Sequence, residues 1–175
     1  MSVNVAVIGL GSMGYGMARS CVQAGLNVYG FDVVAEPVAR LVAEGGNQGQ
    51  MAELAPSFDA VVVVVLNAAQ VETVLFGKDG IVPRLRSGAV VMACATVPPA
   101  FAKDMENRCK GHGVHYLDAP ISGGSVKASQ GNLSVMASGS AEAFTALAPV
   151  LEATAEKVFH LGGKAGAGSA MKAVN

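Results

Sequence analysis

The sequence predicts an α/β fold with a doubly wound, mostly parallel sheet. Short runs rich in β-branched residues alternate with longer segments of helical periodicity, as in a parallel sheet covered by helices on both faces. The run VVVVV at 61–65 lacks the polar alternation of a half-exposed strand, so we expect it to be buried on both sides. The 175 residues are enough for one domain with a well-buried core.

Each expected element is bounded by turn signals. Gly25 ends the first helix, Gly45 and Gly46 end the second, and Pro98-Pro99 begins the helix after the fourth strand, in the positions that these residues prefer. In order along the chain, we expect strands near 3–8, 27–31, 60–66, 88–93, 114–117, 132–138 and 157–160, chosen for their β-branched content. Helices are expected near 12–24, 35–44, 68–75, 98–111, 123–129, 140–154 and from 167 onward.

Charge and composition exclude several classes of function. The net charge is −1 and the basic residues are scattered, so neither nucleic acid nor an anionic membrane is an expected partner. The longest apolar run, 60–66, is far shorter than the roughly 20 residues of a membrane helix. No basic segment precedes the apolar N-terminal stretch, which favours the cytoplasm. Cys21, Cys94 and Cys109 are expected in the core, and no metal site is predicted.

The segment VAVIGLGSMGYGMAR at 5–19 predicts a dinucleotide site. Three glycines follow an apolar strand and open a helix with the spacing Gly9-x-Gly11-x-x-Gly14. Gly9 permits a tight turn, Gly11 lets the backbone approach a diphosphate, and Gly14 allows close packing of helix and strand. The diphosphate would lie at the helix N-terminus, where unpaired N–H groups favour anions. The fold is therefore expected to be of the Rossmann type.

Asp32 indicates which dinucleotide is bound. It ends the second strand, eighteen residues after Gly14, near the spacing at which a carboxylate meets the adenosine ribose. A carboxylate there accepts from the ribose hydroxyls of NAD and repels the extra phosphate of NADP, so NAD is expected and NADP is disfavoured. The alternative is that Asp32 is only a solvated turn residue.

A second glycine-rich turn lies in YLDAPISGGSVKASQG at 116–131. Ser122, Gly123 and Gly124 stand between a strand and a helix, where backbone N–H groups and a hydroxyl could hold a carboxylate. The same residues could equally form an ordinary helix cap. Physical reasoning alone leaves both open.

Three motifs together resemble the β-hydroxyacid dehydrogenase family. GLGSMGYGMA, DAPISGG and GAGSAMK occur in the family's order and at its separations, so the resemblance covers the whole chain. The run LNAAQVETVLFG at 66–77 is most similar to the L-threonate dehydrogenase branch. This chain departs from the family at Ala93 and Ala95, where relatives often have Asp and Ser, and at Asn67, where many have Pro.

The resemblance implies roles for individual residues. Lys172 would be the catalytic acid/base, and Thr96 would lie near the nicotinamide, although Thr96 could instead cap the helix that follows it. The substrate would be held by Ser122, Gly123, Gly124 and Asn175. The implied cofactor-binding residues are Gly9, Leu10, Gly11, Ser12, Met13, Gly14, Asp32, Leu66, Asn67 and Thr96.

The resemblance also implies a reaction: NAD-dependent oxidation of a small hydroxyacid of the L-threonate or 3-hydroxyisobutyrate type. Lys172 must be neutral to accept the hydroxyl proton. Residues 1–165 would form the NAD-binding domain and 166–175 the start of a helix leading to a helical domain beyond this chain. The full-length enzyme would be a homo-oligomer, and the isolated chain would be poorly active. A reductase of the tartronate semialdehyde type and a non-catalytic nucleotide-binding module are the alternatives.

Overall fold

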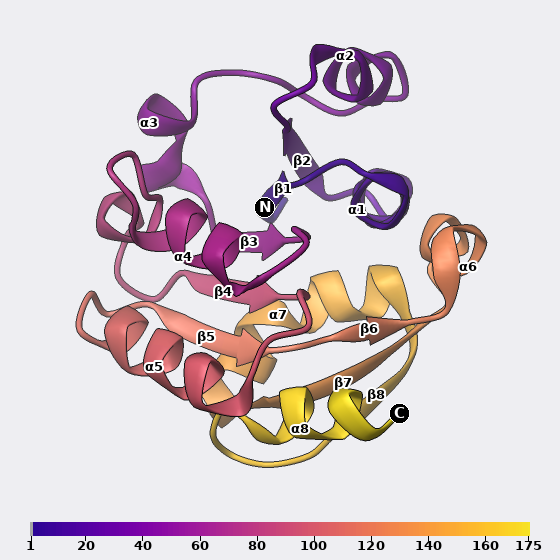
Figure 1. Ribbon diagram of the computed structural model, residues 1–175. Helices are drawn as coiled ribbons and strands as arrows, with labels where there is room; N and C mark the ends of the chain where they lie inside the picture. The colour runs from indigo at the N-terminus through magenta and orange to yellow at the C-terminus, as the bar shows by residue number, and fades with distance from the viewer. Residues whose placement is uncertain (1) are drawn as a thin grey trace.

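A computed structural model describes residues 2–175 as an eight-stranded sheet with helices on both faces (Figure 1). The sheet order is β2-β1-β3-β4-β5-β7-β6, with β8 paired to β7, and β1 to β5 are parallel. The predicted fold class is confirmed. The strands are β1 (Asn4–Ile8), β2 (Asn27–Phe31), β3 (Ala60–Val63), β4 (Val90–Ala93), β5 (His115–Asp118), β6 (Ile121–Ser122), β7 (Leu133–Gly139) and β8 (Ala155–His160).

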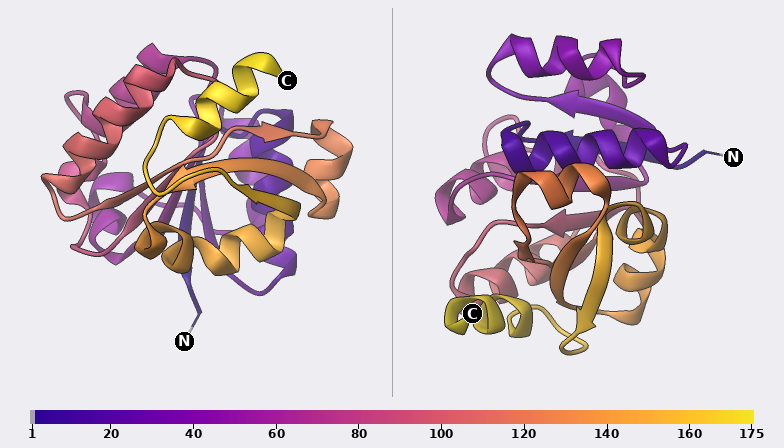
Figure 2. Two further views of the ribbon diagram at one scale, coloured as in Figure 1. Left: turned by 90° about the horizontal axis from the view of Figure 1, so that it is seen from below. Right: turned by 90° about the vertical axis from the view of Figure 1, so that its right-hand side faces the viewer.

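The helices form two layers. The left panel of Figure 2 shows the sheet between α7 on one side and α5 and α8 on the other. Most boundaries lie within two residues of those predicted. The helices are α1 (Ser12–Gln23), α2 (Ala35–Ala43), α3 (Met51–Leu54), α4 (Ala68–Phe76), α5 (Pro99–Lys110), α6 (Gly124–Gln130), α7 (Ala141–Thr154) and α8 (Ala167–Val174), with 3₁₀ turns η1 (Ala55–Ser57) and η2 (Val82–Arg84). None of the helices in residues 2–175 has the length and apolar character that a membrane crossing requires.

The parallel strands contribute side chains to two separate cores. Val62 packs in a cluster with residues of α1 and α7, whereas Val61 and Val63 pack with residues of α4 and α5. The strand within VVVVV is therefore buried on both faces, as predicted. β3 ends at Val63, whereas the strand was expected to continue to Leu66. Leu66 is 85% exposed, beyond the point where the chain leaves the sheet. The three cysteines are free and buried in these cores, as expected.

The last part of the sheet is antiparallel, which the sequence analysis did not predict. β5 and β6 both pair with β7 in one continuous antiparallel register, from Leu117 opposite Gly139 to Ser122 opposite Ser134. The chain between Ser122 and Leu133 contains only α6, which is too short a crossover for a parallel return. α6 packs instead on α1, where a Cβ at Gly16 would lie 2.7 Å from the Ser129 nitrogen (Figure 1).

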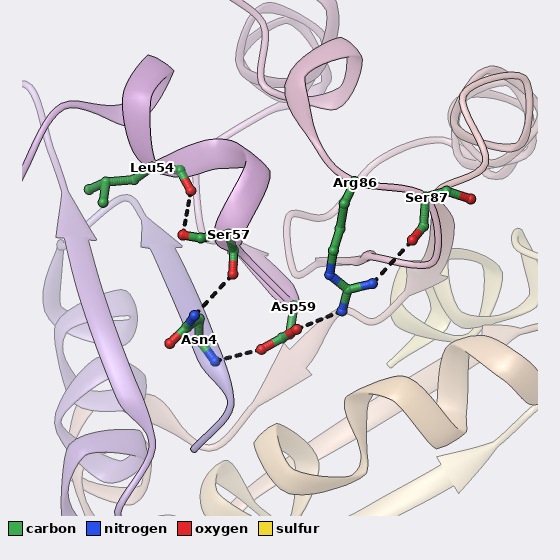
Figure 3. A network of polar contacts seen from close by, with 6 residues as sticks. All are labelled: Asn4, Leu54, Ser57, Asp59, Arg86 and Ser87. Atoms are coloured by element: carbon green, nitrogen blue, oxygen red, sulfur yellow. Dashed lines mark hydrogen bonds and ion pairs between the residues drawn. The ribbon is translucent and has the colours of Figure 1, made fainter. Parts of the chain in front are cut away.

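Polar side chains join the amino ends of the central strands (Figure 3). Asp59 accepts a hydrogen bond from the Asn4 N–H at 2.8 Å and pairs with the Arg86 guanidinium at 2.6 Å. The Asn4 side chain donates to the Ser57 carbonyl at 3.0 Å. Partial burial raises the pKa of Asp59, but the Asn4 N–H and the Arg86 charge outweigh it and hold this pKa below its ordinary value of 3.8.

The lowered pKa predicts a pH-dependent contribution to stability. The contribution is present above the unfolded pKa of 3.8 and is lost as the pH falls through the lower folded value. We expect Asp59→Asn to lower the free energy of unfolding at pH 7 by about 1 kcal/mol, since the ion pair is partly solvated. The deficit should shrink at pH 3. Urea unfolding measures both values, with Asp79→Asn in an exposed turn as control; an equal deficit at both pH values would contradict the assignment.

Candidate active site

A cleft of about 1310 Å³ opens at the carboxyl ends of β1, β2 and β3. Its floor includes Gly9 and Gly11 after β1, Asp32 after β2, and Leu66 and Asn67 after β3. β2 lies on one side of β1 and β3 on the other, so the order in which the chain adds strands to the sheet reverses at β1. Open α/β sheets bind ligands at such switch points. The walls come from α2, from the segment that leads into the start of α3, and from α4. They include Val38, Gln50, Met51, Gln70, Thr73 and Val74.

The three glycines of the first turn differ in their surroundings. Gly9 has φ +97°, and a Cβ there would lie 2.1 Å from the Val64 carbonyl oxygen. A Cβ at Gly14 would lie 1.8 Å from the Gly9 oxygen. A Cβ at Gly11 would instead enter open space, with no heavy atom of residues 2–175 within 4 Å. Gly9 and Gly14 thus permit close packing, and Gly11 leaves room beside the helix.

Helix α1 begins at the floor of the cleft without a side-chain cap. Its N-cap is Gly11, which has no side chain, and its first helical bond runs from the Tyr15 N–H to the Gly11 oxygen at 2.8 Å. The preceding N–H groups of a helix have no intrahelical partner and carry the positive end of the helix dipole. This end of the cleft can therefore accept an anion such as a diphosphate, and residues 2–175 leave the space beside Gly11 open.

Asp32 is half-buried and lines the cleft. One carboxylate oxygen accepts from the Leu10 N–H at 2.7 Å and the other from the Val34 N–H at 2.8 Å. Asp32 is thus more than a solvated turn residue, because it ties the glycine turn to the end of β2. Each oxygen keeps acceptor capacity for a ribose hydroxyl. Val33 follows with its side chain fully exposed and carries no charge to attract a 2′-phosphate.

The structure brings some of the other predicted cofactor residues to this cleft, but not all. Leu66 and Asn67 line it. Leu10 turns its side chain into the core and offers its N–H to Asp32, while Ser12 is exposed and Met13 packs against the core. Thr96 is exposed beyond the end of β4, outside the cleft. Its alternative role as a helix cap is not what the structure shows, because the N-cap of α5 is Pro98.

The predicted substrate turn lies on the antiparallel side of the sheet. Ser122 is half-buried at the end of β6, and the exposed Gly123 is the N-cap of α6 with φ +139°. The capping residue therefore has no side chain, and the Ser122 hydroxyl is not the cap of this helix. A carboxylate-binding role for Ser122, Gly123 and Gly124 stays a prediction.

A buried carboxylate holds the helix that carries Lys172. Asp118 is fully buried at the end of β5 and accepts from the Gly166 N–H at 3.0 Å, the Ser169 N–H at 2.8 Å and the Ser169 hydroxyl at 2.6 Å. Ser138 on β7 accepts from the Gly168 N–H at 2.9 Å. These bonds give the N–H groups of Gly166, Gly168 and Ser169 acceptors at the N-terminus of α8. The sequence analysis did not assign this role to Asp118.

Lys172 and Asn175 lie at the far end of that helix. Lys172 is half-buried in the last turn of α8, and Asn175 is exposed as its C-cap. The tight packing at the other end of α8 is visible at Gly168, where a Cβ would lie 2.3 Å from the Met136 carbonyl oxygen. The roles of Lys172 and Asn175 stay predictions.

Comparisons with known proteins agree with this geometry. An L-threonate dehydrogenase from Escherichia coli O6:H1 is 45% identical over 174 residues, which cover 98% of this chain and 58% of the relative. A 3-hydroxyisobutyrate dehydrogenase from Pseudomonas aeruginosa is 35% identical over 173 residues, or 98% of this chain and 58% of the relative. The chain thus spans somewhat more than half the length of the curated relatives it matches.

A solved structure and a family of domains match as well. The crystal structure of a 3-hydroxyisobutyrate dehydrogenase from Salmonella typhimurium superposes with a TM-score of 0.95 at 44% identity, covering 99% of this chain and 61% of that one. These matches confirm the predicted fold, the resemblance to hydroxyacid dehydrogenases and NAD as the cofactor. Residues 4–162 match the NAD binding domain of 6-phosphogluconate dehydrogenase, and the chain belongs to that domain family.

Proposed function

We propose that this chain is the NAD-binding portion of a dehydrogenase that oxidises a small hydroxyacid of the L-threonate or 3-hydroxyisobutyrate type. The observation that carries the proposal is the uncapped start of α1 at Gly11, which opens into the same cleft as Asp32. On this proposal, residues 1–165 form the NAD-binding domain and 166–175 begin a helix that continues into a helical domain. The enzyme would be a cytoplasmic homo-oligomer.

The residues present fit the cofactor. The open space at Gly11 and the first N–H groups of α1 would hold the diphosphate, and Asp32 would accept from the adenosine ribose. Leu66 and Asn67 would line the cofactor, and Thr96, beyond β4, would lie near the nicotinamide end. When bound, NAD supplies the hydride acceptor.

The remaining groups of the reaction lie on the other half of the sheet. The amides around Ser122, Gly123 and Gly124 would hold the substrate carboxylate, and Asn175 would make a further contact with it. Lys172, as a neutral amine, would take the hydroxyl proton at its Nζ as the hydride leaves the carbon. In the reverse direction, the Lys172 ammonium would give that proton to a carbonyl oxygen.

The buried Asp118 holds the start of α8, the helix that carries Lys172. Its carboxylate fixes the first turn of α8, and Lys172 lies one turn further along the same helix. A negative charge at a helix N-terminus also interacts favourably with the positive end of the helix dipole. The direction in which α8 leaves the sheet, and hence the position of Lys172, therefore depends on Asp118.

Calorimetric titration tests the cofactor half of the proposal. We expect the chain to bind NAD and to bind NADP at least about tenfold more weakly, because Asp32 repels a 2′-phosphate. Gly11→Val should abolish NAD binding by filling the diphosphate space, while changing the free energy of unfolding by only about 1 kcal/mol. The matched control is Gly163→Val, since a Cβ at Gly163 also has no heavy atom of residues 2–175 within 4 Å. NAD binding by the folded Gly11→Val variant would contradict the site.

An oxidation assay tests the substrate half. The polypeptide that contains this chain and a following helical domain is expected to form NADH with L-threonate or 3-hydroxyisobutyrate, and Lys172→Ala should abolish it. The 175-residue chain alone should form little NADH. Binding of NAD without oxidation of any small hydroxyacid by the longer polypeptide would favour a non-catalytic module.

Asp118→Asn tests the anchoring of α8. The amide of Asn keeps an acceptor but directs an NH₂ group toward other donors, so the first turn of α8 should open at a cost of about 1–3 kcal/mol. We expect hydrogen exchange at Gly166, Gly168 and Ser169 to accelerate about tenfold or more, with the amides of β1 and β3 unchanged. Ser138→Ala is the milder variant, because it removes the bond from the Gly168 N–H and the long bond of 3.5 Å from the Ser138 hydroxyl to Asp118 but leaves the Asp118 carboxylate in place. Unchanged exchange in both variants would refute the anchoring.

A further inference from the structure

We propose that Gln70 is a positioning residue for the cofactor, acting through Leu66. Gln70 fixes the turn at residues 66 and 67, and this turn directs the Leu66 side chain into the cleft. The inference rests on the proposed function, because it assumes that the cleft holds NAD. Gln70 lies within the run 66–77 that carries the family resemblance, but the sequence analysis assigned it no role.

Two short hydrogen bonds join Gln70 to the turn in both directions. The Leu66 N–H donates to the Gln70 side-chain oxygen at 2.7 Å, and the Gln70 N–H donates to the Asn67 side-chain oxygen at 2.9 Å. The Val71 N–H also donates to the Asn67 carbonyl at 3.1 Å. This is a variant of the capping box, in which a side chain of the first helical turn reaches back to a backbone N–H ahead of the helix.

The position of Leu66 depends on these bonds because packing does not hold its side chain. Leu66 is 85% exposed, whereas Val63, three residues earlier, is fully buried in the sheet. Immobilising a side chain of this kind on binding costs free energy, and a backbone that already has the bound direction reduces that cost. The Gln70 bond to the Leu66 N–H supplies that direction before the cofactor arrives.

The same bonds determine the chemistry of this wall of the cleft. The start of α1 and the start of α4 both border the cleft. At α1 the cap is Gly11, which has no side chain to accept from the first N–H groups. At α4 the Asn67 side chain accepts from the Gln70 N–H, and the Gln70 side chain accepts from the Leu66 N–H just ahead of the helix. A diphosphate therefore meets an uncapped helix start at α1 and a side-chain-capped one at α4, where Leu66 would give the uncharged parts of the cofactor an apolar contact.

A double-mutant cycle tests whether Gln70 acts through Leu66. Gln70→Met keeps the length of the side chain and removes the acceptor, and we expect it to raise the dissociation constant of NAD about fivefold. Leu66→Ala should also weaken binding. In the Leu66→Ala background, Gln70→Met should have almost no further effect, because the side chain that it positions is gone. Gln23→Met, on the exposed end of α1, is the matched control.

Hydrogen exchange of the Leu66 amide reports directly on its hydrogen bond to the Gln70 side chain. The Leu66 amide should be protected from exchange in the wild type and should lose that protection in Gln70→Met. Protection should return in Gln70→Glu, which restores an acceptor oxygen at the same place. Additive losses of affinity in the cycle would overturn the proposal, since Gln70 would then contact the cofactor directly or act through the fold. An unprotected Leu66 amide in the wild type would also overturn it. Failure of the wild type to bind NAD would instead refute the proposed function, and the exchange measurement would still stand.

Discussion

The close approach of α1 to the ends of β1 and β3 is the constraint on which the candidate site depends. Gly14 meets the Gly9 carbonyl and Gly9 meets the Val64 carbonyl at distances that leave no room for a Cβ. The helix therefore starts directly against the ends of the two strands, with its N-terminus at the floor of the cleft. Any side chain at either position would displace the helix and move the first N–H groups of α1 away from Asp32. The fold and the cofactor site thus share one set of contacts.

Three aspartates at strand ends differ in what their carboxylates contact. Asp59, before β3, is bound to Asn4 and Arg86 and joins strands at the edge opposite the cleft. Asp118, the last residue of β5, is fully buried and accepts hydrogen bonds from Gly166 and Ser169 at the start of α8. Asp32, after β2, is half-buried and holds two backbone amides, yet it faces the cleft and retains lone pairs. Among these three, Asp32 is the carboxylate placed to receive a ligand.

Sequence reasoning predicted the parallel part of the fold well because each strand there is a β-branched run and each helix is long enough to show its period. It did not predict α3, η1 and η2, which are a single turn or less, or β6, which is two residues long. It also missed the antiparallel direction of β7. The short connection from β6 to β7 requires that direction, and it was not recognised because β6 itself is only two residues long.

The candidate site divides in the same way. The glycine spacing and Asp32 are local signals, and the structure brings these residues to one cleft. The spacing Asn67-x-x-Gln70 could have suggested a capped helix, but only the fold shows that this helix borders the cofactor cleft. The bonds of Asp118 to α8 join residues about fifty positions apart, and no local pattern indicates them. Family resemblance was needed to connect Lys172 with the chemistry.

The arrangement of the two halves indicates where the reaction would occur on the proposed function. The residues that would bind the nucleotide lie at the ends of β1, β2 and β3, whereas Ser122 and α8 lie beyond β5 in the sheet order. β4 is the strand between them, and the exposed Thr96 follows its carboxyl end. On the proposed function, Gly11 and Asp32 would hold the diphosphate and adenosine parts of the dinucleotide, and Thr96 would lie near its nicotinamide end. Lys172 would then take the substrate proton from α8, the helix whose first turn Asp118 holds in place.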